Sequence, residues 1–290
     1  MDLKLFDLPT DEIYKDVFQP SMQKVGEALS TVLNTANLIL LPLKLINEKS
    51  RIYFKDNIKR YSEKIEKKDL TIIPVPEIVG LPILDKLTYI NQKELSETFL
   101  NLLTKATFKE TIDLVHPAFL NILNNLSAEE AKILFFYKDT ERIPYIELYV
   151  HKYKKPPSFM SESRVKTKKE LQEEITYSFE ERNDTYIRYA SNLTGIEKRV
   201  DLIFPKNIDI YIENLQHNGL IFFETDLINI NDLDIYKRLK EEDYKEICDE
   251  LENTLSEWKN EDYNYEIDIK KRSIQFTELG KSFIKACINE

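Results

Sequence analysis

The sequence predicts an α+β fold that is mostly helical, with a helical N-terminal region and a winged-helix-like C-terminal region. Apolar residues recur every three or four positions over most of residues 20–138, as they do in amphipathic helices. Ile146, Leu148 and Val150 instead alternate with other residue types, which is typical of a strand. Toward the C-terminus, a helical pattern, Gly219, β-like residues and a closing helix follow one another in the order of a winged helix.

Periodicity and capping residues place the N-terminal helices. Residues 20–46 and 52–65 have apolar positions at helical spacing, and the second segment carries basic residues on its opposite face. A proline-rich connector follows, in which Pro82 is expected to open a short helix. Further helices are expected to begin at the capping-box-like Asn91–Glu94, at Pro117 and at the capping box Ser127–Glu130.

We expect three parts along the chain. Residues 1–150 form the helical N-terminal region and end in the first strand, 151–169 form a basic linker or long loop, and 170–290 form the winged-helix-like region. An acidic insertion at 225–272 takes the position of the wing, and Asn231 or Asp232 is expected to cap a helix within it. The other expected elements are helices at 168–181 and 206–218, strands at 220–224, 265–269 and 273–276, and a last helix capped by Thr277.

Charge is unevenly distributed along the chain. The 41 basic and 51 acidic residues give a net charge of −10, which argues against broad affinity for nucleic acid. Residues 44–68 nevertheless carry +5 and residues 151–169 carry +6, whereas residues 241–266 carry −9. Such runs are usually solvated faces, but the basic ones are also candidate anion contacts. In the second basic segment the candidates are Lys152, Lys154, Lys155, Lys168 and Lys169.

The N-terminus and the cysteines indicate a reducing compartment. The first residues are acidic and lack a basic segment followed by an apolar run, so a secretory signal is not expected. Cys248 and Cys287 are interpreted as reduced thiols, and helical spacing from Phe283 and Ile284 places Cys287 in the core. We therefore expect a cytoplasmic protein, either wholly in the cytoplasm or peripheral at the inner face of the membrane.

The sequence is poor in the patterns that catalytic and cofactor sites require. No two of its five glycines are closer than 24 residues, which excludes a Walker loop and a Rossmann turn. Three histidines and two cysteines show no zinc-binding spacing, and there is no GxSxG nucleophile elbow. We accordingly predict no cofactor, no metal and no catalytic residue, which favours a non-enzymatic protein.

Two features could still carry chemistry. His116 precedes Pro117 and is interpreted as a residue of the helix start rather than a metal ligand. Glu266, Asp268 and Lys270 share one face of a predicted strand, and such an acid–lysine pair can hold a metal and orient water in a nuclease. Because 32% of the residues are charged, a solvent-facing strand with alternating charge is the favoured interpretation.

An uncharged segment precedes the basic helix. Residues 28–43 carry no charge, but they are too few and too polar for a convincing transmembrane helix. Residues 28–46 are either buried, which is favoured, or lie with the basic helix in a membrane interface. The candidate membrane or partner contacts are Leu38, Ile39, Leu41, Leu43, Lys44, Lys55, Lys59 and Arg60.

The predicted helix before Gly219 is poorly suited to reading DNA. A winged helix inserts this helix into the major groove and needs cations or amides at the base edges. Residues 206–217 offer one lysine against Asp209 and Glu213, so the phosphates repel it. The winged helix is therefore interpreted as a scaffold or protein-contact surface, and a nucleic-acid-binding regulator is the alternative.

Short segments over most of the chain resemble one family. They are Gln19–Ser21, Lys24–Leu29, Leu40–Leu43, Asn47–Lys49, Pro76–Ile78, Leu95–Ala106, His116–Phe119, Glu130–Leu134, Gly219–Ile221 and Leu279–Gly280. These residues resemble the abortive infection alpha (Abi-alpha) family, with the likeness weakest at 151–205 and 225–272. The resemblance implies a role in bacterial abortive infection, in which an infected cell stops supporting phage growth. It carries over no catalytic residue, because the family has no established catalytic set.

We therefore expect an antiphage defence protein that acts through contacts rather than turnover. Its expected partner is another protein or an anionic membrane surface, nucleic acid is not expected, and homo-oligomer formation is left open. The winged-helix regulator and the nuclease remain as alternatives.

Overall fold

The computed structural model describes residues 22–33, 47–156, 160, 165–179, 184–224, 230–258, 260 and 262–289. Over these residues it confirms an α+β fold that is mostly helical, with a four-stranded antiparallel sheet. The chain divides into two compact units. The helical unit comprises Met1–Thr140, Val200–Phe222 and Phe276–Glu290, and the sheet unit comprises Glu141–Arg199 and Phe223–Gln275. The three parts predicted from the sequence are contiguous, whereas each compact unit combines separated segments.

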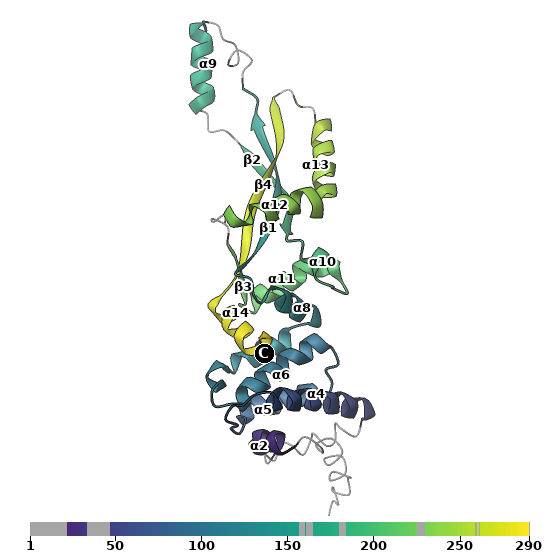
Figure 1. The fold of residues 1–290 in the computed structure, drawn as a ribbon. Coiled ribbons are helices and arrows are strands. Elements are labelled where there is room, and N and C mark those ends of the chain that lie inside the picture. Colours follow the sequence, from purple (N-terminus) through teal and green to yellow (C-terminus); the bar gives the residue numbers. More distant parts are fainter. Residues whose placement is uncertain are drawn as a thin grey trace, which may run out of the picture. The chain divides into compact units, whose positions relative to one another are not determined.

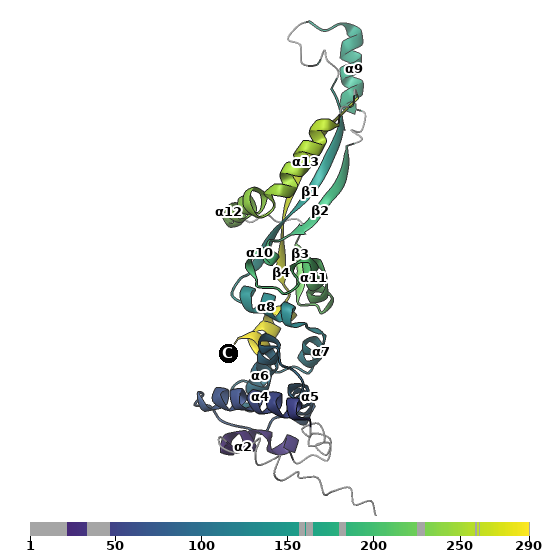
Figure 2. The same cartoon turned by 90° about the vertical axis from the view of Figure 1, so that its right-hand side faces the viewer.

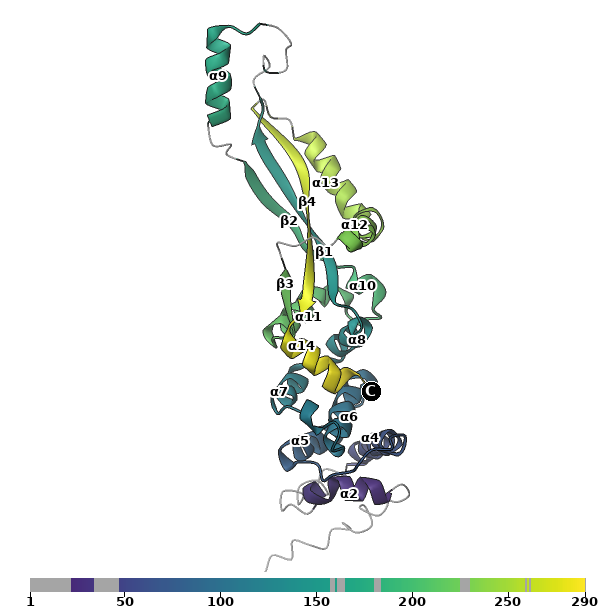
Figure 3. The same cartoon turned by 60° about the vertical axis from the view of Figure 1, so that its left-hand side comes forward.

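The helical unit is organised around one buried helix, α6 (Lys93–Thr107), in which all residues from Thr98 to Thr107 are buried. In Figures 1 and 3, α6 lies between α4 and α5 on one side and the C-terminal α14 on the other. The neighbouring helices supply its apolar surroundings. The other elements are α2 (Met22–Leu33), α4 (Glu48–Glu66), α5 (Glu77–Leu87), η2 (Ile112–Leu114), α7 (Ala118–Asn125), α8 (Ala128–Tyr137), η4 (Pro205–Asn207), α11 (Ile208–His217), α14 (Glu278–Phe283) and η7 (Ile284–Ile288).

Local signals set several helix ends as predicted. Ser127 and Glu130 form the reciprocal capping box of α8, and the Thr277 hydroxyl accepts a hydrogen bond from the Gly280 N–H at the start of α14. Gly219 follows α11 with a φ of +71°, which a glycine adopts without the steric cost of a side chain.

Two predicted helix starts were wrong. Asn91 does not cap α6, because the N-cap position falls on Gln92, whose side chain makes no capping hydrogen bond. Pro82 does not open a helix but lies inside α5, which begins at Glu77. Its missing N–H falls opposite the carbonyl of Ile78, a residue that is 64% exposed, so water can satisfy that carbonyl.

The sheet unit is built on a long central strand. The strands are β1 (Arg142–Lys154), β2 (Thr185–Leu193), β3 (Ile221–Glu224) and β4 (Tyr263–Phe276), in the spatial order β2-β1-β4-β3. β1 pairs antiparallel with both β2 and β4, with Arg142 opposite Gln275 and Lys154 opposite Tyr263. The helical elements are α9 (Lys168–Phe179), α10 (Ile196–Arg199), η5 (Ile230–Asp232), α12 (Leu233–Arg238), η6 (Leu239–Asp243) and α13 (Lys245–Glu257).

One face of the sheet carries the core of this unit. Alternate residues of β1, Ile146, Leu148 and Val150, are buried against α12, η6 and α13, as their predicted alternation requires. Figure 2 shows α13 lying along the strands on this side, with α12 beside the lower end of α13. The opposite face of β1 carries Glu147 and Tyr149, which belong to a network of charged and aromatic side chains.

The strand predictions were right in type and too short in extent. The predicted strands 265–269 and 273–276 are one continuous strand, β4. The segment expected to be a linker contributes residues 151–154 to β1 and residues 168–169 to α9. β2 was missed because it is an edge strand whose first five residues are all exposed, so its sequence lacks a clear buried face.

Candidate functional site

The exposed side of α4 is close to electrically neutral. Its buried residues include Phe54, Ile58, Tyr61 and Ile65, which pack inside the helical unit as the predicted periodicity requires. The exposed basic residues of α4 are Lys49, Lys55 and Lys59, and the exposed acidic residues are Glu48, Asp56, Glu63 and Glu66. Because 3 − 4 = −1, the predicted contact residues Lys55 and Lys59 lie on a nearly balanced surface, not on a cationic one.

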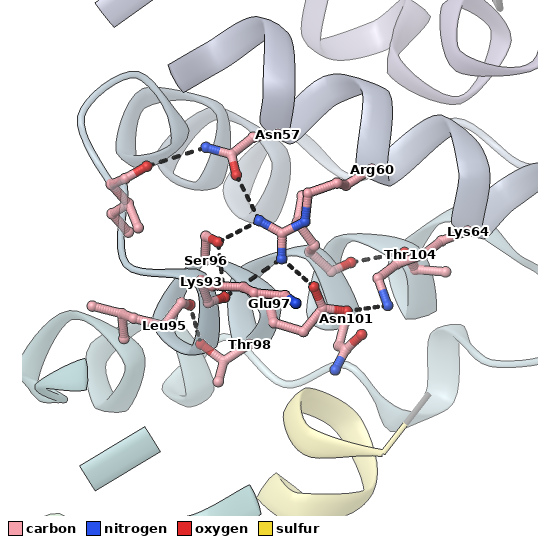
Figure 4. Close-up of polar contacts among 12 residues, drawn as sticks. Asn57, Arg60, Lys64, Lys93, Leu95, Ser96, Glu97, Thr98, Asn101 and Thr104 are labelled. Atoms are coloured by element: carbon pink, nitrogen blue, oxygen red, sulfur yellow. Dashed lines mark hydrogen bonds and ion pairs between the residues drawn. The ribbon is translucent and has the colours of Figure 1, made fainter. Parts of the chain in front are cut away.

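Arg60 and Lys64 turn away from this surface toward α6. The Arg60 guanidinium donates to the Ser96 hydroxyl at 2.7 Å, and both Arg60 and Lys64 form ion pairs with Glu97. Figure 4 shows this arrangement, with Asn57 accepting from Arg60 on the other side. Arg60, predicted to contact a membrane or partner, is thus bonded within the helical unit.

Glu97 is ionised in this network. Burial opposes ionisation of its carboxyl, but the hydrogen bonds and positive charges of Lys64 and Arg60 outweigh that effect and lower the pKa of Glu97. The carboxylate therefore holds both basic side chains against α6. It neutralises one of the two charges and leaves one.

Next to this network lies a cavity of about 200 Å³, which we call the lysine pocket. It is formed where α4 and α6 both end, beside the C-terminal segment. Figure 4 shows three of its residues, Lys64, Asn101 and Thr104, on facing turns of α4 and α6. The residues that line it are Lys64, Lys67, Lys68, Asn101, Thr104, Lys105 and Asn289.

The uncharged residues of the lysine pocket are fixed by main-chain partners. The Asn101 amide donates to the carbonyls of Cys287 and Ile288, at 3.1 and 3.2 Å. The Thr104 hydroxyl donates to the Leu100 carbonyl at 2.7 Å. Because their hydrogens are used in this way, both side chains present oxygen lone pairs that can accept from lysine ammonium groups.

The lining of the lysine pocket is basic. It contains four lysines, of which Lys64 pairs with Glu97, and the C-terminal ends of α4 and α6 place about −0.5 of a charge each beside it. No carboxylate is among the described lining residues, and neither Lys67 nor Lys68 has an ion pair or side-chain hydrogen bond to a described residue. The arrangement is suited to binding an anion.

These lysines were not singled out from the sequence. The +5 segment at 44–68 includes Lys64, Lys67 and Lys68, but the charge count does not say which side of the helix each occupies. Lys105 is separated from them by a helix and a connector, and it is only 8% exposed. Lysine is rarely this buried, and a lysine at the end of a predicted buried helix is the one signal that could have identified the pocket.

The candidate anion contacts of the second basic segment belong to the sheet unit. The Lys152 ammonium lies 4.1 Å from the centroid of the Tyr263 ring. The Lys155 ammonium donates to the Asn260 carbonyl at 2.6 Å, and Lys169 lies 3.9 Å from the Glu173 carboxylate. Lys154 and Lys168 are exposed. Lys152, Lys154 and Lys155 are at the end of β1 and the other two are at the start of α9.

The remaining predicted contacts, Leu38, Ile39, Leu41, Leu43 and Lys44, lie outside the described residues, and so does most of 28–46. Among the described helices none is long and apolar enough to cross a membrane.

Of the nuclease-like residues on β4, Asp268 and Lys270 are paired with each other, and Glu266 accepts a hydrogen bond from the Tyr153 hydroxyl. The Lys270 ammonium lies 2.6 Å from the Asp268 carboxylate, and this hydrogen bond raises the pKa of Lys270. Glu147, the carboxylate opposite Lys270 on β1, is held by Arg272 at 2.7 Å. Within the described part of the chain, no group of three histidine, cysteine or carboxylate side chains could hold a metal ion.

His116 and the two cysteines have structural roles. His116 accepts a hydrogen bond from the Ala118 N–H at 3.1 Å, in line with a role at the start of α7. Cys248 and Cys287 are unpaired by disulfides and buried, which confirms Cys287 as a core residue. Burial raises the pKa of both thiols, that of Cys287 well above its usual range.

Comparison with known proteins gives one match. The sequence model of the family described as "Abortive infection alpha" matches residues 53–287. The match covers α4 from Tyr53 onward, all of α6 and all but one of the residues that line the lysine pocket. No curated protein and no solved structure matches the chain significantly.

Proposed function

The chain belongs to the abortive infection alpha family, and from this premise we propose that it is an antiphage effector that acts by binding an anionic membrane surface through the lysine pocket. The family supports an abortive-infection-type defence role. The pocket supports the mode of action, because four lysines line it and two of them, Lys67 and Lys68, form no ion pair with a described residue. Elsewhere the conspicuous charges, such as Arg199 with Asp243 and Arg272 with Glu147, are already paired.

The single observation that carries this proposal is the state of Lys67 and Lys68. They lie directly after the last residue of α4, Glu66, and no described carboxylate pairs with either of them. Leu70, two residues further on, keeps 37% of its surface exposed. The two adjacent lysines can approach anionic headgroups while Leu70, which follows the exposed Asp69, contacts the apolar boundary.

Vesicle flotation of the full chain tests the proposal. The double substitution Lys67→Gln/Lys68→Gln should weaken partitioning onto anionic vesicles about 30-fold, because each lysine near such a surface contributes about 1 kcal/mol. The matched control is Lys55→Gln/Lys59→Gln, which removes the same charge from the balanced face of α4 and should leave flotation nearly unchanged. The pocket variant should also lose phage protection in a plating assay.

Three results would overturn the proposal: no flotation of the wild type, equal flotation of the two double variants, or full protection by the pocket variant. If the wild type does not float but an acidic protein is retained through Lys67 and Lys68, the alternative of a protein partner replaces the membrane.

The winged-helix regulator remains the second candidate, but the exposed side of α11 does not favour it. Asp209 and Glu213 are both exposed there, and Ile210 between them is 62% exposed. A helix with this surface repels phosphates and offers no cation to base edges. Gel retardation of duplex DNA at physiological salt by the wild-type chain, abolished by substitutions in α11, would support the regulator instead.

A further inference from the structure

We propose that the sheet unit binds an extended, basic segment of a partner protein in a groove between α13 and the outer edge of β4, where the segment adds a strand to the sheet. The groove, which we call the edge groove, is a cavity of about 490 Å³. It is lined by Cys248, Glu252 and Leu255 of α13 and by Tyr265, Ile267 and Ile269 of β4. All of these residues belong to the sheet unit, so the proposal does not depend on the lysine pocket.

The edge groove lies on the side of β4 that faces away from β1. Its described strand residues come from β4 alone, although β1 and β2 belong to the same sheet. β3, the other neighbour of β4, has four residues and lies beside the C-terminal end of β4, as Figure 3 shows. It begins directly after Leu220, whose carbonyl accepts from the Thr277 N–H at 3.0 Å, so it reaches back to about Ser273. Residues 263–271 therefore have no described strand on their outer side.

The main chain of this part of β4 offers hydrogen-bonding groups to the edge groove. In an antiparallel pair, successive residues of a strand direct their N–H and C=O groups to opposite sides. The Lys155 N–H donates to the carbonyl of Asp262 at 2.8 Å, and the register with β1 continues along β4 without a shift. Even-numbered residues of β4 therefore face β1, and the odd-numbered residues Tyr265, Ile267 and Ile269 face outward. An extended segment can pair with these outward groups, as in other cases of strand addition.

The side chains of the edge groove are apolar and incompletely covered. Leu255, Tyr265, Ile267 and Ile269 pack against the buried core between β1 and α13, but each remains only partly buried. The three β4 residues thus present their side chains and their outward main-chain groups to the same groove. A strand added about 4.8 Å from β4 would place every second side chain on this apolar surface.

The size of the edge groove matches a short extended segment. At the rise of a strand, Tyr265 and Ile269 are about 13 Å apart, which corresponds to about five residues of a paired segment. Two or three of those residues would face α13. The volume lies within the range of about 300–1,000 Å³ that is usual for sites that bury a bound group. We expect β-branched residues at these positions, because they suit a half-buried strand.

The charge of α13 favours a basic segment. The helix carries five acidic residues and one basic residue, which gives 1 − 5 = −4. All six are exposed, and they are Glu246, Asp249, Glu250, Glu252, Glu257 and Lys245. Glu252 and Glu266 line the edge groove itself, against the one described basic lining residue, Lys240. Lysine or arginine side chains in the segment would lie within a Debye length of this surface and be attracted to it.

Peptide titration of the full chain tests the proposal. Isothermal calorimetry is performed with a blocked peptide of seven residues in which lysine and valine alternate. One methylated version carries N-methyl groups on the valine amides and the other carries them on the lysine amides, and a third version has glutamate in place of lysine. The emission of Trp258, the only tryptophan, gives a second readout, because its ring centroid lies 5.2 Å from that of Tyr265.

We expect the unmethylated basic peptide to bind and to change the emission of Trp258. One methylated peptide should bind at least about tenfold more weakly, because its methyl groups replace the donors that face β4. The other should bind like the unmethylated peptide, because its methyl groups face away from the sheet. The acidic peptide should bind at least about tenfold more weakly than the basic one.

Two charge reversals on α13 locate the binding site. Glu252→Lys places a cation in the wall of the edge groove and should weaken binding of the basic peptide about fivefold or more. Glu250→Lys is the matched control, because Glu250 lies on the opposite flank of the helix and should leave the affinity within about twofold. Both residues are exposed, and circular dichroism verifies that both variants are folded.

Several results would overturn the proposal. Absence of binding by the basic peptide, or equal affinities of the two methylated peptides, would exclude strand addition at one edge. Equal effects of Glu252→Lys and Glu250→Lys would place the peptide elsewhere, and equal affinities of the acidic and basic peptides would remove the basic partner. Self-association of the chain that the peptide reverses in sedimentation would assign the edge groove to a second copy instead of a separate protein.

Discussion

The side-chain amide of Asn101 donates a hydrogen bond to the main-chain oxygen of Cys287, 3.1 Å away and 186 residues later in the sequence. A second bond reaches the oxygen of Ile288 at 3.2 Å. The last carbonyls of a helix have no partner within it, and here they are buried against α6. Asn101 supplies the missing donor, so one side chain both closes the C-terminal segment onto α6 and forms part of the lysine pocket.

Replacing Asn101 by Ala should therefore destabilise the protein. Two buried carbonyls lose their donor, and an unsatisfied buried acceptor costs about 1–3 kcal/mol. Urea unfolding followed by circular dichroism should give a lower midpoint with an unchanged slope. Asn91→Ala is the matched control, because Asn91 is exposed and does not cap α6, and its effect should stay within about 0.5 kcal/mol. Equal midpoints for the two variants would contradict the role assigned to Asn101.

Glu97 should make stability depend on pH in the acid range. Because its pKa is lowered in the folded state, its ionised form contributes stability that is present above the unfolded value of about 4.3 and is lost as the pH falls through the folded pKa. Glu97→Gln should cost about 1–3 kcal/mol at pH 7. The free energies of unfolding of wild type and variant should converge on acidification, because protonation removes the same charge as the substitution. A constant difference from pH 7 to pH 3 would count against this account.

Whether the sequence alone predicts a contact depends on how many residues separate the two partners along the chain. Ser127 and Glu130, or Thr277 and Gly280, are three residues apart, so their capping geometry is already implied by the local pattern. Ile146, Leu148 and Val150 reveal their strand because these apolar residues alternate with the charged or aromatic residues Glu147 and Tyr149. β2 gives no such signal, since Tyr186, Ile187 and Tyr189 are all 45–51% exposed and point to both sides of an edge strand.

The candidate site, in contrast, is formed by residues that are far apart in the sequence. Arg60 and Glu97 are 37 residues apart, and the lysine pocket also needs Lys105 and Asn289. A pattern of charge on α4 could not distinguish lysines that turn toward α6 from lysines on the balanced outer face. Only the packing of α4 on α6 decides that, which is why Arg60 was assigned to an outward contact while Lys67 and Lys68 were not named.

Two glycines of the helical unit should respond in opposite ways to substitution by Ala. A Cβ atom on Gly280 would lie 2.0 Å from the main-chain oxygen of Leu220, and neither main-chain segment can yield without disturbing α14. Gly280→Ala should thus cost several kcal/mol, in the range of overpacking substitutions or above. Gly26 is inside α2 with nothing within 4 Å of the added atom, so Gly26→Ala should stabilise by about 0.5–1 kcal/mol. Thermal unfolding of both variants measures the contrast, which would be refuted by shifts of the same sign.

The pair Asp268 and Lys270 offers a direct test between a nuclease and a binding effector. Their side chains are 31% and 44% exposed and bond to one another, and exposed pairs contribute about 0–1 kcal/mol to stability. Asp268→Asn/Lys270→Gln should therefore fold normally and, because the proposed mode of action lies in the lysine pocket, keep full phage protection. Under the same plating conditions Lys67→Gln/Lys68→Gln should lose protection. A metal-assisted nuclease predicts the reverse ranking, because removing its acid and its lysine abolishes the activation of water while leaving anion binding in the helical unit intact.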